Sequence, residues 1–199
     1  EDLLAAFTPA RLEENRLVTS QNNTNLLIRN QCDVLIHVNV PVPEHVPAYN
    51  RIRGFEDTCK EHHIPYELML QDLGYTYETT YVAIRQVFQK IDSTYSGKKK
   101  GVFLSNDTYA NIFLNLLFQK YGKLPEDYQI VGFDNSPIAN EAILPITTIG
   151  QQIDKIAKTA MELLILQMDE MKKRRPTPLE HPIHKQITPV LIRRETTDS

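Results

Sequence analysis

The chain has 199 residues, of which 41% are hydrophobic and 24% are charged, close to the averages for soluble globular proteins. This composition argues against disorder and allows one domain or two small ones, each with a real core. The formal net charge of -3 gives the chain no electrostatic reason to hold a phosphate backbone, so any nucleic-acid contact needs a segment outside it.

The N-terminal stretch EDLLAAFTPARLEEN has neither the basic start nor the apolar core of a signal peptide. No apolar run approaches the ~20 residues that cross a bilayer. Cys32 and Cys59 lie in neither a CxxC nor a Cys-His spacing, and we expect two reduced, buried thiols. Together these features favour a cytoplasmic protein without membrane contact, although a mature exported protein would also lack its signal.

The first thirty residues are difficult to assign, but from residue 33 onward short apolar runs alternate with helical segments. The β-branched run at 33–38 predicts a buried strand, and apolar residues then recur on one face of 49–63. Extended character resumes at 64–68. A second helical stripe covers 81–91, before a glycine and the three lysines at 98–100 interrupt the pattern.

The remaining elements, in chain order, are a strand at 101–105, a strong helix at 110–121, a strand at 128–133, a second strong helix at 152–171 and a final strand at 189–194. Gly122 directly follows the first of these helices and is typical of a helix stop. The basic run at 172–175 closes the second helix, where cations face the negative end of the helix dipole.

Strands that alternate with helices predict an α/β fold, with a parallel sheet flanked by helices on both faces. In such sheets ligands bind at the carboxyl ends of the strands. We therefore expect the site just after residues 38, 105 and 133.

Polar residues follow these predicted strand ends. Asn106 and Asp107 come after the strand at 101–105, Asp134 comes after the next strand, and Arg51 opens the helix that follows the first strand. A carboxylate, an amide and a guanidinium suit a polyhydroxylated ligand, because each makes two hydrogen bonds to neighbouring hydroxyls. Structural alternatives stay open: Asp107 as a plain N-cap, Asn106 as a turn residue, an Asx turn after Asp134, and a solvated Arg51.

The stretch VGFDNSPIANEAILPITTIGQQ at 131–152 resembles a signature of LacI/GalR-type repressors, in which a VG(F/Y)D(D/N) strand end leads through a proline to TTI-x-Q. The ending LIRRETT is similar to the L(I/V)xRxST of that family. FLSNDTYA resembles its N-D element, and NRIRGF resembles its R-x-x-GF helix. The four elements occur in the family's order over roughly residues 33 to 197.

The resemblance implies that Arg51, Asn106, Asp134 and Gln151 hydrogen-bond the hydroxyls, ring oxygen or carboxylate of a small effector, usually a sugar. Gln151 could instead satisfy backbone groups, because it lies at a crossover between subdomains. The proline-rich loop at 40–50 shapes one wall of this pocket and is unusual for the family, so the identity of the sugar does not carry over.

The implied fold is a two-lobed, periplasmic-binding-protein-like sensor whose N-terminal lobe is incomplete in this chain. Residues 1–32 are then a remnant of the N-terminal subdomain and a crossover, and 33–148 form the C-terminal effector-binding subdomain. Residues 149–188 supply a crossover and a helix of the N-terminal subdomain, and 189–199 the final strand and tail. Either the chain is a fragment or its numbering runs across missing segments.

The implied function is the effector-binding domain of a bacterial DNA-binding transcriptional regulator, in which a sugar allosterically controls operator binding. Its expected partners are a second copy in a homodimer and operator DNA, bound through an N-terminal helix-turn-helix absent from this chain. The helix at 107–121 and the loop at 137–145 are candidates for the dimer contact, the former also for core.

The alternative function is the sugar-binding component of a transport system, which predicts an export signal and usually no LIRRETT ending. An enzyme is not expected, because the chain has no GxSxG, GxGxxG or P-loop pattern and Asp134 with Asp107 is the only candidate pair. We expect no cofactor and no metal.

Two further features favour structural interpretations. His62 and His63 point about 100° apart on a helix, and His181 and His184 are expected on the surface. The basic runs at 98–100 and 172–175 are expected to be solvated rather than to contact DNA.

Overall fold

The structure is a computed structural model, and it describes residues 20–46, 49–172 and 185–198. Its centre is a four-stranded sheet in the order β2-β1-β3-β4, in which every pair of neighbours is parallel. These strands are Val34–Asn39 (β1), Tyr66–Leu70 (β2), Lys100–Leu104 (β3) and Tyr128–Val131 (β4). The predicted parallel sheet is confirmed.

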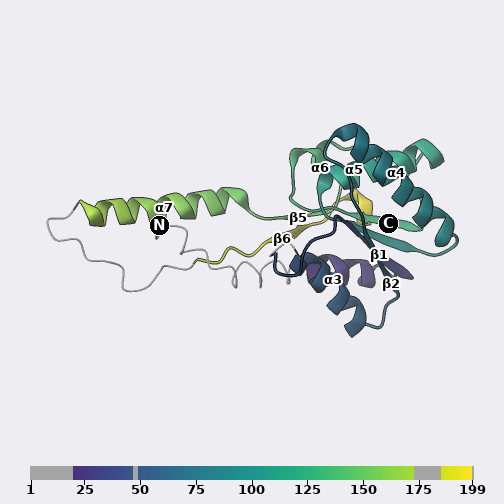
Figure 1. Cartoon of the computed structure of the whole chain (residues 1–199), viewed down its shortest axis with the longest axis horizontal. Coiled ribbons are helices and arrows are strands. Elements are labelled where there is room, and N and C mark those ends of the chain that lie inside the picture. The colour runs from purple at the N-terminus through teal and green to yellow at the C-terminus, as the bar shows by residue number, and fades with distance from the viewer. Residues whose placement is uncertain (1–19, 47–48, 173–184, 199) are drawn as a thin grey trace.

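Helices cover both faces of this sheet (Figure 1). The labelled helices are Tyr49–Glu61 (α3), Tyr77–Thr94 (α4), Asp107–Tyr121 (α5), Pro137–Glu141 (α6) and Ile153–Met171 (α7). Of these, α7 does not cover the sheet. The chain runs from β1 to β2 on one side and then crosses back to β3 on the other side of β1. This reversal between β1 and β3 is a topological switch point, where α/β sheets bind ligands.

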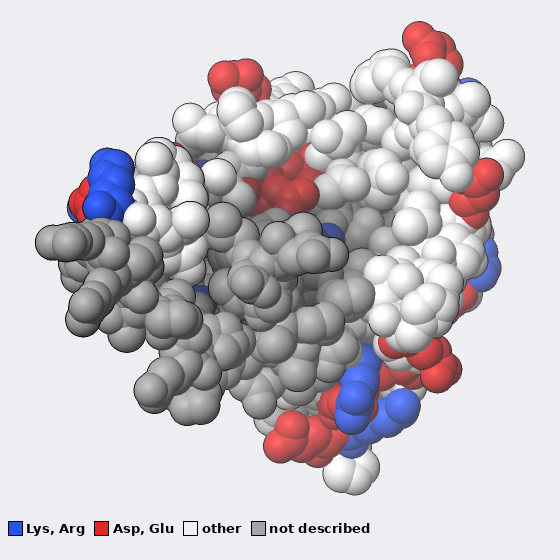
Figure 2. Space-filling model, turned by 60° about the vertical axis from the view of Figure 1, so that its left-hand side comes forward, with Lys and Arg blue, Asp and Glu red and all other residues white. Residues whose placement is uncertain are grey.

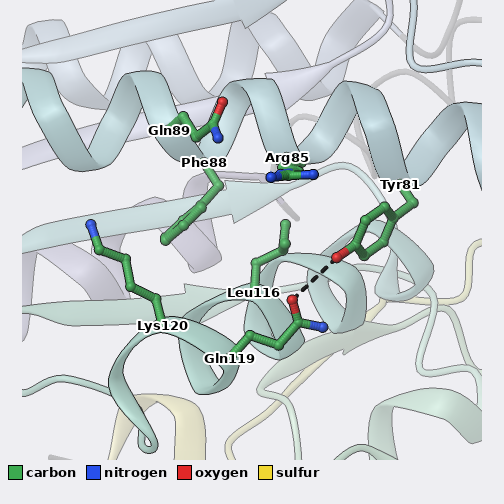
Figure 3. A pocket seen from close by; sticks show the side chains of 7 residues that line it. All are labelled: Tyr81, Arg85, Phe88, Gln89, Leu116, Gln119 and Lys120. Carbon is green, nitrogen blue, oxygen red and sulfur yellow. Dashed lines mark hydrogen bonds between the residues drawn. The ribbon is translucent and has the colours of Figure 1, made fainter.

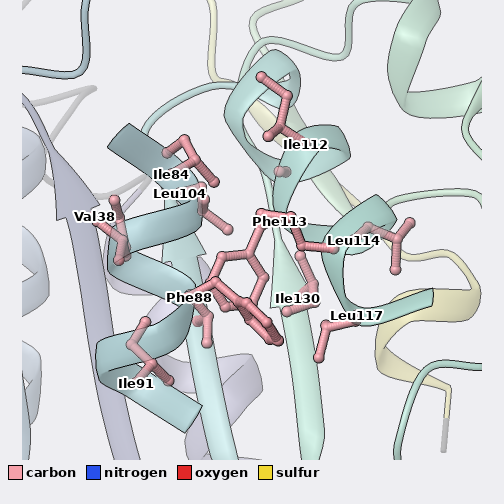
Figure 4. Close-up of a cluster of buried hydrophobic side chains, with 14 of the residues drawn as sticks. Val38, Ile84, Phe88, Ile91, Leu104, Ile112, Phe113, Leu114, Leu117 and Ile130 are labelled. Atoms are coloured by element: carbon pink, nitrogen blue, oxygen red, sulfur yellow. The ribbon is translucent and has the colours of Figure 1, made fainter. Parts of the chain in front are cut away.

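The larger core fills the face under α4 and α5, and Figure 4 shows its side chains converging from these helices and from the strands between them. Phe88 of α4 meets Phe113 of α5 edge to face, with ring centroids 5.6 Å apart. The predicted stop of α5 is also present, because Gly122 adopts the left-handed conformation with φ 73° and its amide bonds to the carbonyl of Phe118.

The opposite face carries a smaller core under α3 and a helical segment at 20–29. Leu27 of that segment is fully buried beside Phe55 and Phe103, so residues 20–32 pack on this sheet, although the sequence suggests a remnant of another subdomain. Cys32 and Cys59 are free and buried here, as predicted, and burial raises the pKa of each thiol to about 12.

A two-stranded antiparallel sheet leads away from the main body. It pairs Thr148–Gly150 (β5) with the final strand Val190–Ile192 (β6), followed by the 3-10 helix Glu195–Thr197 (η1). Isolated parallel bridges from Val131 to Thr147 and from Asp134 to Gly150 place β5 beside the end of β4. The predicted final strand therefore forms, but it is not part of the parallel sheet.

Helix α7 extends away from the sheet (Figure 1) and has no buried residue, although its sequence shows an apolar stripe. Within that stripe Ile153 is 60% exposed and Met168 is 49% exposed, while Ile156, Ala160, Leu163 and Leu164 are only partly buried. The stripe is thus not buried in the part of the chain that the structure describes. That α7 belongs to a second lobe stays a prediction.

Two expectations about particular segments are wrong. Lys100 is 1% exposed, because it begins β3 and its ammonium group pairs with the carboxylate of Asp127 and lies 4.3 Å from the ring of Tyr128. The stretch 137–145, expected as a loop, begins with α6. His181, His184 and residues 173–175 lie outside the described residues.

Two further properties concern the described residues. No helix there is both long enough and apolar enough to span a bilayer. The same residues contain no group of three or more histidine, cysteine or acidic side chains arranged to hold a metal ion.

Candidate functional site

The turn that carries Asp134 has an uncommon backbone conformation. Asp134 and Asn135 have φ values of 100° and 52°, a region that non-glycine residues enter at a cost of about 1–3 kcal/mol each and keep only when their surroundings hold them there. The amide of Asp134 donates to the carbonyl of Ile149 at 2.9 Å, and the amide of Asn135 donates to Thr148 Oγ1 at 3.3 Å. These two hydrogen bonds to β5 hold the backbone of the turn, and with it the direction in which the Asp134 side chain points.

Gln151 lies directly after β5 and reaches back to this turn. Its Nε2 donates to Asp134 Oδ1 at 2.7 Å, so the side chain contacts the carboxylate rather than a backbone group. Both residues are half-buried. The structure thus brings together two of the four predicted ligand residues.

Arg51 lies in the first turn of α3 and points across the carboxyl ends of two strands. Its Nη1 donates to the carbonyl of Ser105 at 3.0 Å, and its guanidinium carbon lies 3.7 Å from the ring centroid of Phe133. This distance suits a cation–π contact. The structural alternative of a solvated helix residue is wrong for Arg51, which is half-buried beside Asp134's neighbour in the chain.

Asn106 is the N-cap of α5, and its Oδ1 accepts a hydrogen bond from the amide of Tyr109 at 2.9 Å. The alternative that gives the cap to Asp107 is therefore wrong by one residue. The cap uses the side-chain oxygen, while the side-chain nitrogen carries two hydrogen-bond donors.

Asp107 is the residue whose importance the sequence does not show. It is 1% exposed, and its carboxylate accepts hydrogen bonds from Ser136 N at 2.7 Å, Ser136 Oγ at 3.1 Å and Thr148 Oγ1 at 2.6 Å. Burial raises its pKa above the usual aspartate range, and the charge of Asp134 adds to that rise. The one sequence signal is Gly132, where a Cβ would come within 2.3 Å of Asp107 Oδ1.

The edge of the sheet that carries Arg51, Asn106, Asp134 and Gln151 is called the rim. His37 lies fully buried on β1 beneath it. Its ring stacks on Phe103 at 4.5 Å between centroids, and its Nδ1 lies 3.0 Å from the carbonyl of the same residue. Its pKa is lowered to about 4, mainly by burial and in smaller part by the nearby charge of Arg51. A neutral imidazole therefore supports the floor near Arg51. The sequence missed it because a histidine inside a β-branched run has no local signal.

The rim combines the half-buried carboxylate of Asp134, the guanidinium of Arg51 and the side-chain amides of Asn106 and Gln151. This set is suited to neighbouring hydroxyl groups of a ligand. The face shown in Figure 2 carries acidic side chains in a recess, and its described basic side chains are scattered rather than joined in a patch. Such a surface gives no support for contact with a phosphate backbone.

A hollow of about 350 Å³ lies between α4 and α5 (Figure 3). Tyr81 donates a hydrogen bond to Gln119 Oε1 across it at 3.2 Å, and Arg85 and Lys120 also line it. None of the predicted ligand residues lines this hollow, so we separate it from the candidate site.

Comparison with known proteins matches residues 26–197 to the model of the periplasmic binding protein-like domain. The ribose operon repressor of Halalkalibacterium halodurans is 28% identical over 188 residues, which cover 91% of this chain and 52% of that protein. The chain thus spans about half the length of this curated relative.

Solved structures give the same fold. A probable maltose operon transcriptional repressor from Staphylococcus aureus superposes with a TM-score of 0.73 at 18% identity, over 92% of this chain and 60% of that one. A LacI family transcriptional regulator from Enterococcus faecium with bound ribose gives a TM-score of 0.69 at 21% identity, over 92% and 63%. The chain belongs to the periplasmic binding protein-like family, and the likeness to LacI/GalR-type regulators that its motifs predict is confirmed.

Proposed function

We propose that this chain is the effector-sensing part of a bacterial DNA-binding repressor that responds to a small sugar or sugar derivative. The observation that carries the proposal is the placement of Asp134, Asn106 and Arg51 on one rim at the switch point, with Gln151 bonded to Asp134. Relatives named as ribose and maltose operon repressors support the sugar class.

Each side chain has a distinct proposed role at the ligand. The Asp134 carboxylate accepts hydrogen bonds from two neighbouring hydroxyls, an arrangement that a vicinal diol satisfies. Arg51 donates to a hydroxyl, ring oxygen or carboxylate of the effector, with its guanidinium held flat by Phe133. Asn106 contributes its two side-chain donors, and Gln151 extends the contact to the crossover.

We further propose that the effector acts through this crossover. Gln151 lies between β5 and α7, so an effector that contacts both Asp134 and Gln151 connects the main sheet to α7. Residues 33–148, together with the segment at 20–32 that packs on the same sheet, then form the C-terminal effector-binding subdomain, while 149–188 supply a crossover and the helix of an N-terminal subdomain. The effector shifts the population of two relative arrangements by no more than its difference in affinity for them.

The proposed assembly is a homodimer that binds operator DNA through a helix-turn-helix outside this chain and acts in the cytoplasm. The outer side of α5 and the segment from Pro137 to Pro145 are the proposed dimer contacts. Most of the apolar stripe of α5 is core, since Phe113, Leu114 and Leu117 are fully buried.

A sugar-binding component of a transport system is the second candidate, because it shares the two-lobed fold. The relatives of this chain are named as repressors, which favours the regulator. A catalytic role is not proposed. Asp107 is the candidate acid-base partner of Asp134, but its carboxylate oxygens are bonded to Ser136 and Thr148.

A thermal-shift panel on the full-length gene product tests the proposal, with D-ribose, D-glucose, maltose and their phosphates as probes. A sugar at one hundred times its Kd stabilises the protein by about 2.7 kcal/mol. We expect Asp134→Ala to remove that stabilisation. Asp57→Ala, which breaks only an exposed ion pair with Arg53, should keep it.

The proposal fails if no sugar shifts the melting temperature, or if Asp134→Ala responds like the unaltered protein. The gene upstream separates the two candidates. A helix-turn-helix there supports the repressor, whereas a signal peptide supports the transport component.

A further inference from the structure

We propose that Asp107 is the positioning residue of the effector site: it holds the Asp134 turn in its ligand-binding conformation and ties that turn to the crossover strand β5. This inference rests on the proposed function, in which Asp134 binds the sugar. Asp107 itself is 1% exposed and makes no contact with the effector in this scheme.

Several groups of the turn depend on Asp107. The amide and the hydroxyl of Ser136 both donate to its Oδ2, at 2.7 and 3.1 Å. The amide of Asn135 donates to the hydroxyl of Thr148, which in turn donates to Oδ1 at 2.6 Å. Two consecutive amides directly after Asp134 are therefore held by one carboxylate, directly or through one hydroxyl.

The backbone conformation of the turn requires contacts that hold it. Asp134 and Asn135 both have positive φ, and such residues relax unless neighbouring contacts hold them. An ionised carboxylate is suited to holding them because it only accepts hydrogen bonds, and the three groups that bond to Asp107 Oδ1 and Oδ2 here are all donors. An asparagine offers one acceptor oxygen, and its amide nitrogen must face one of these donors.

Asp107 lies where three segments of the chain meet. It begins α5, its amide donates to the carbonyl of Phe133 at 3.0 Å, and its side chain bonds to the turn and to β5. The Cβ-less Gly132 permits this close approach. A displacement of Asp134 by the effector is consequently shared with Thr148, two residues before the glycine that leads to Gln151.

The experiment compares Asp107→Asn with Asp92→Asn in the full-length gene product. Asp92 is a matched control, because its carboxylate also accepts three hydrogen bonds, from Lys120, Tyr121 and Tyr128, at the opposite end of the sheet. Titration calorimetry with D-ribose, D-glucose and maltose measures affinity, and amide hydrogen exchange measures the turn without sugar.

We expect Asp107→Asn to weaken the binding of the sugar that the unaltered protein takes by about tenfold, the usual size for a lost hydrogen bond to a buried charge. Asp92→Asn should leave affinity unchanged. In an Asp134→Asn background, the further loss caused by Asp107→Asn should shrink to less than about twofold, because a residue that acts through Asp134 has nothing left to position. A general structural defect would instead reduce affinity in both backgrounds.

Amide exchange decides the question independently of the sugar. The amides of Asn135 and Ser136 should exchange faster in Asp107→Asn and not in Asp92→Asn. If no sugar binds the unaltered protein, the proposed function fails, while faster exchange still establishes that Asp107 holds the turn. Unchanged exchange, or an affinity loss that persists at full size in the Asp134→Asn background, overturns the inference.

Discussion

Replacing Gly132 by alanine probes the close approach of Asp107 to the chain after β4. A Cβ at this position would lie 2.3 Å from Asp107 Oδ1 and 3.4 Å from both the Cβ of Ala110 and the Cα of Asp107. Side chains do not tolerate the first of these contacts, so the carboxylate has to move. The shift separates Oδ1 from the hydroxyl of Thr148, which now lies 2.6 Å away.

The expected cost combines two effects. Loss of a hydrogen bond to a buried charged group costs about 1.5–3 kcal/mol, and crowding of a filled site costs about 1–3 kcal/mol. We therefore expect Gly132→Ala to lower the free energy of unfolding by about 3–5 kcal/mol. For a chain of this size each kcal/mol lowers the melting temperature by about 2–4 °C, which gives a fall of roughly 6–20 °C.

Urea denaturation of Gly132→Ala, Asp107→Ala and the double variant measures this effect. Because the clash is with the Asp107 carboxylate, the alanine at 132 should cost less than about 1 kcal/mol once that carboxylate is absent. Gly97→Ala is the control, since nothing lies within 4 Å of its Cβ and only its φ of 75° opposes the change. A cost of Gly132→Ala no larger than that of the control, or equal with and without the Asp107 side chain, would show that the close contact with the carboxylate is not what opposes a side chain here.

Three further outcomes follow from contacts elsewhere in the fold. Asp127→Ala should cost about 3 kcal/mol because it leaves the buried ammonium of Lys100 without its carboxylate, whereas Lys100→Met should cost clearly less; equal losses in urea denaturation would contradict this. His37 has its pKa lowered from the ordinary 6.5 to about 4, so the unfolded chain binds a proton there that the folded chain does not. Its contribution is complete above pH 6.5, and stability falls by about 1.4 kcal/mol per pH unit from there to pH 4. His37→Phe should lose this part of the pH dependence, and an identical slope would count against it. Thr76→Ala should lower stability by about 1 kcal/mol, because Thr76 caps α4 by accepting from the amide of Thr79; a cost near zero would show that the cap contributes nothing.

The strands and helices of the main sheet were predictable because their burial is regular. β1 and β3 are buried at every position and coincide with short apolar runs, that of β1 being β-branched, while α4 and α5 each show an apolar stripe that meets the sheet. The stripe of α7 is equally clear, yet it contacts no core in the described residues. Periodicity reports which face of a helix is apolar, and it carries no information on which surface that face meets.

The rim of the site was predictable from topology, since strand ends in a parallel sheet meet at one edge. Arg51, Asn106 and Asp134 lie at that edge, and Gln151 joins Asp134; their roles as ligand contacts stay a prediction. The part played by Asp107 could not be predicted, because its partners lie 29 and 41 residues further along the chain. Contacts of that kind arise only when the chain has folded.

The contacts of η1 with β4 bear on how the protein is synthesised. Thr196 donates its hydroxyl to the carbonyl of Ile130 at 2.7 Å, across a separation of 66 residues, and accepts from the amide of Thr147. At translation rates of roughly 5–20 residues per second, the edge of β4 is made about 3–13 s before Thr196 exists. During that interval the carbonyl of Ile130 lacks the Thr196 hydroxyl, and unpaired backbone groups at a strand edge favour pairing with other chains. Slow codons between positions 150 and 196 would lengthen this exposure without changing a single residue of the folded protein.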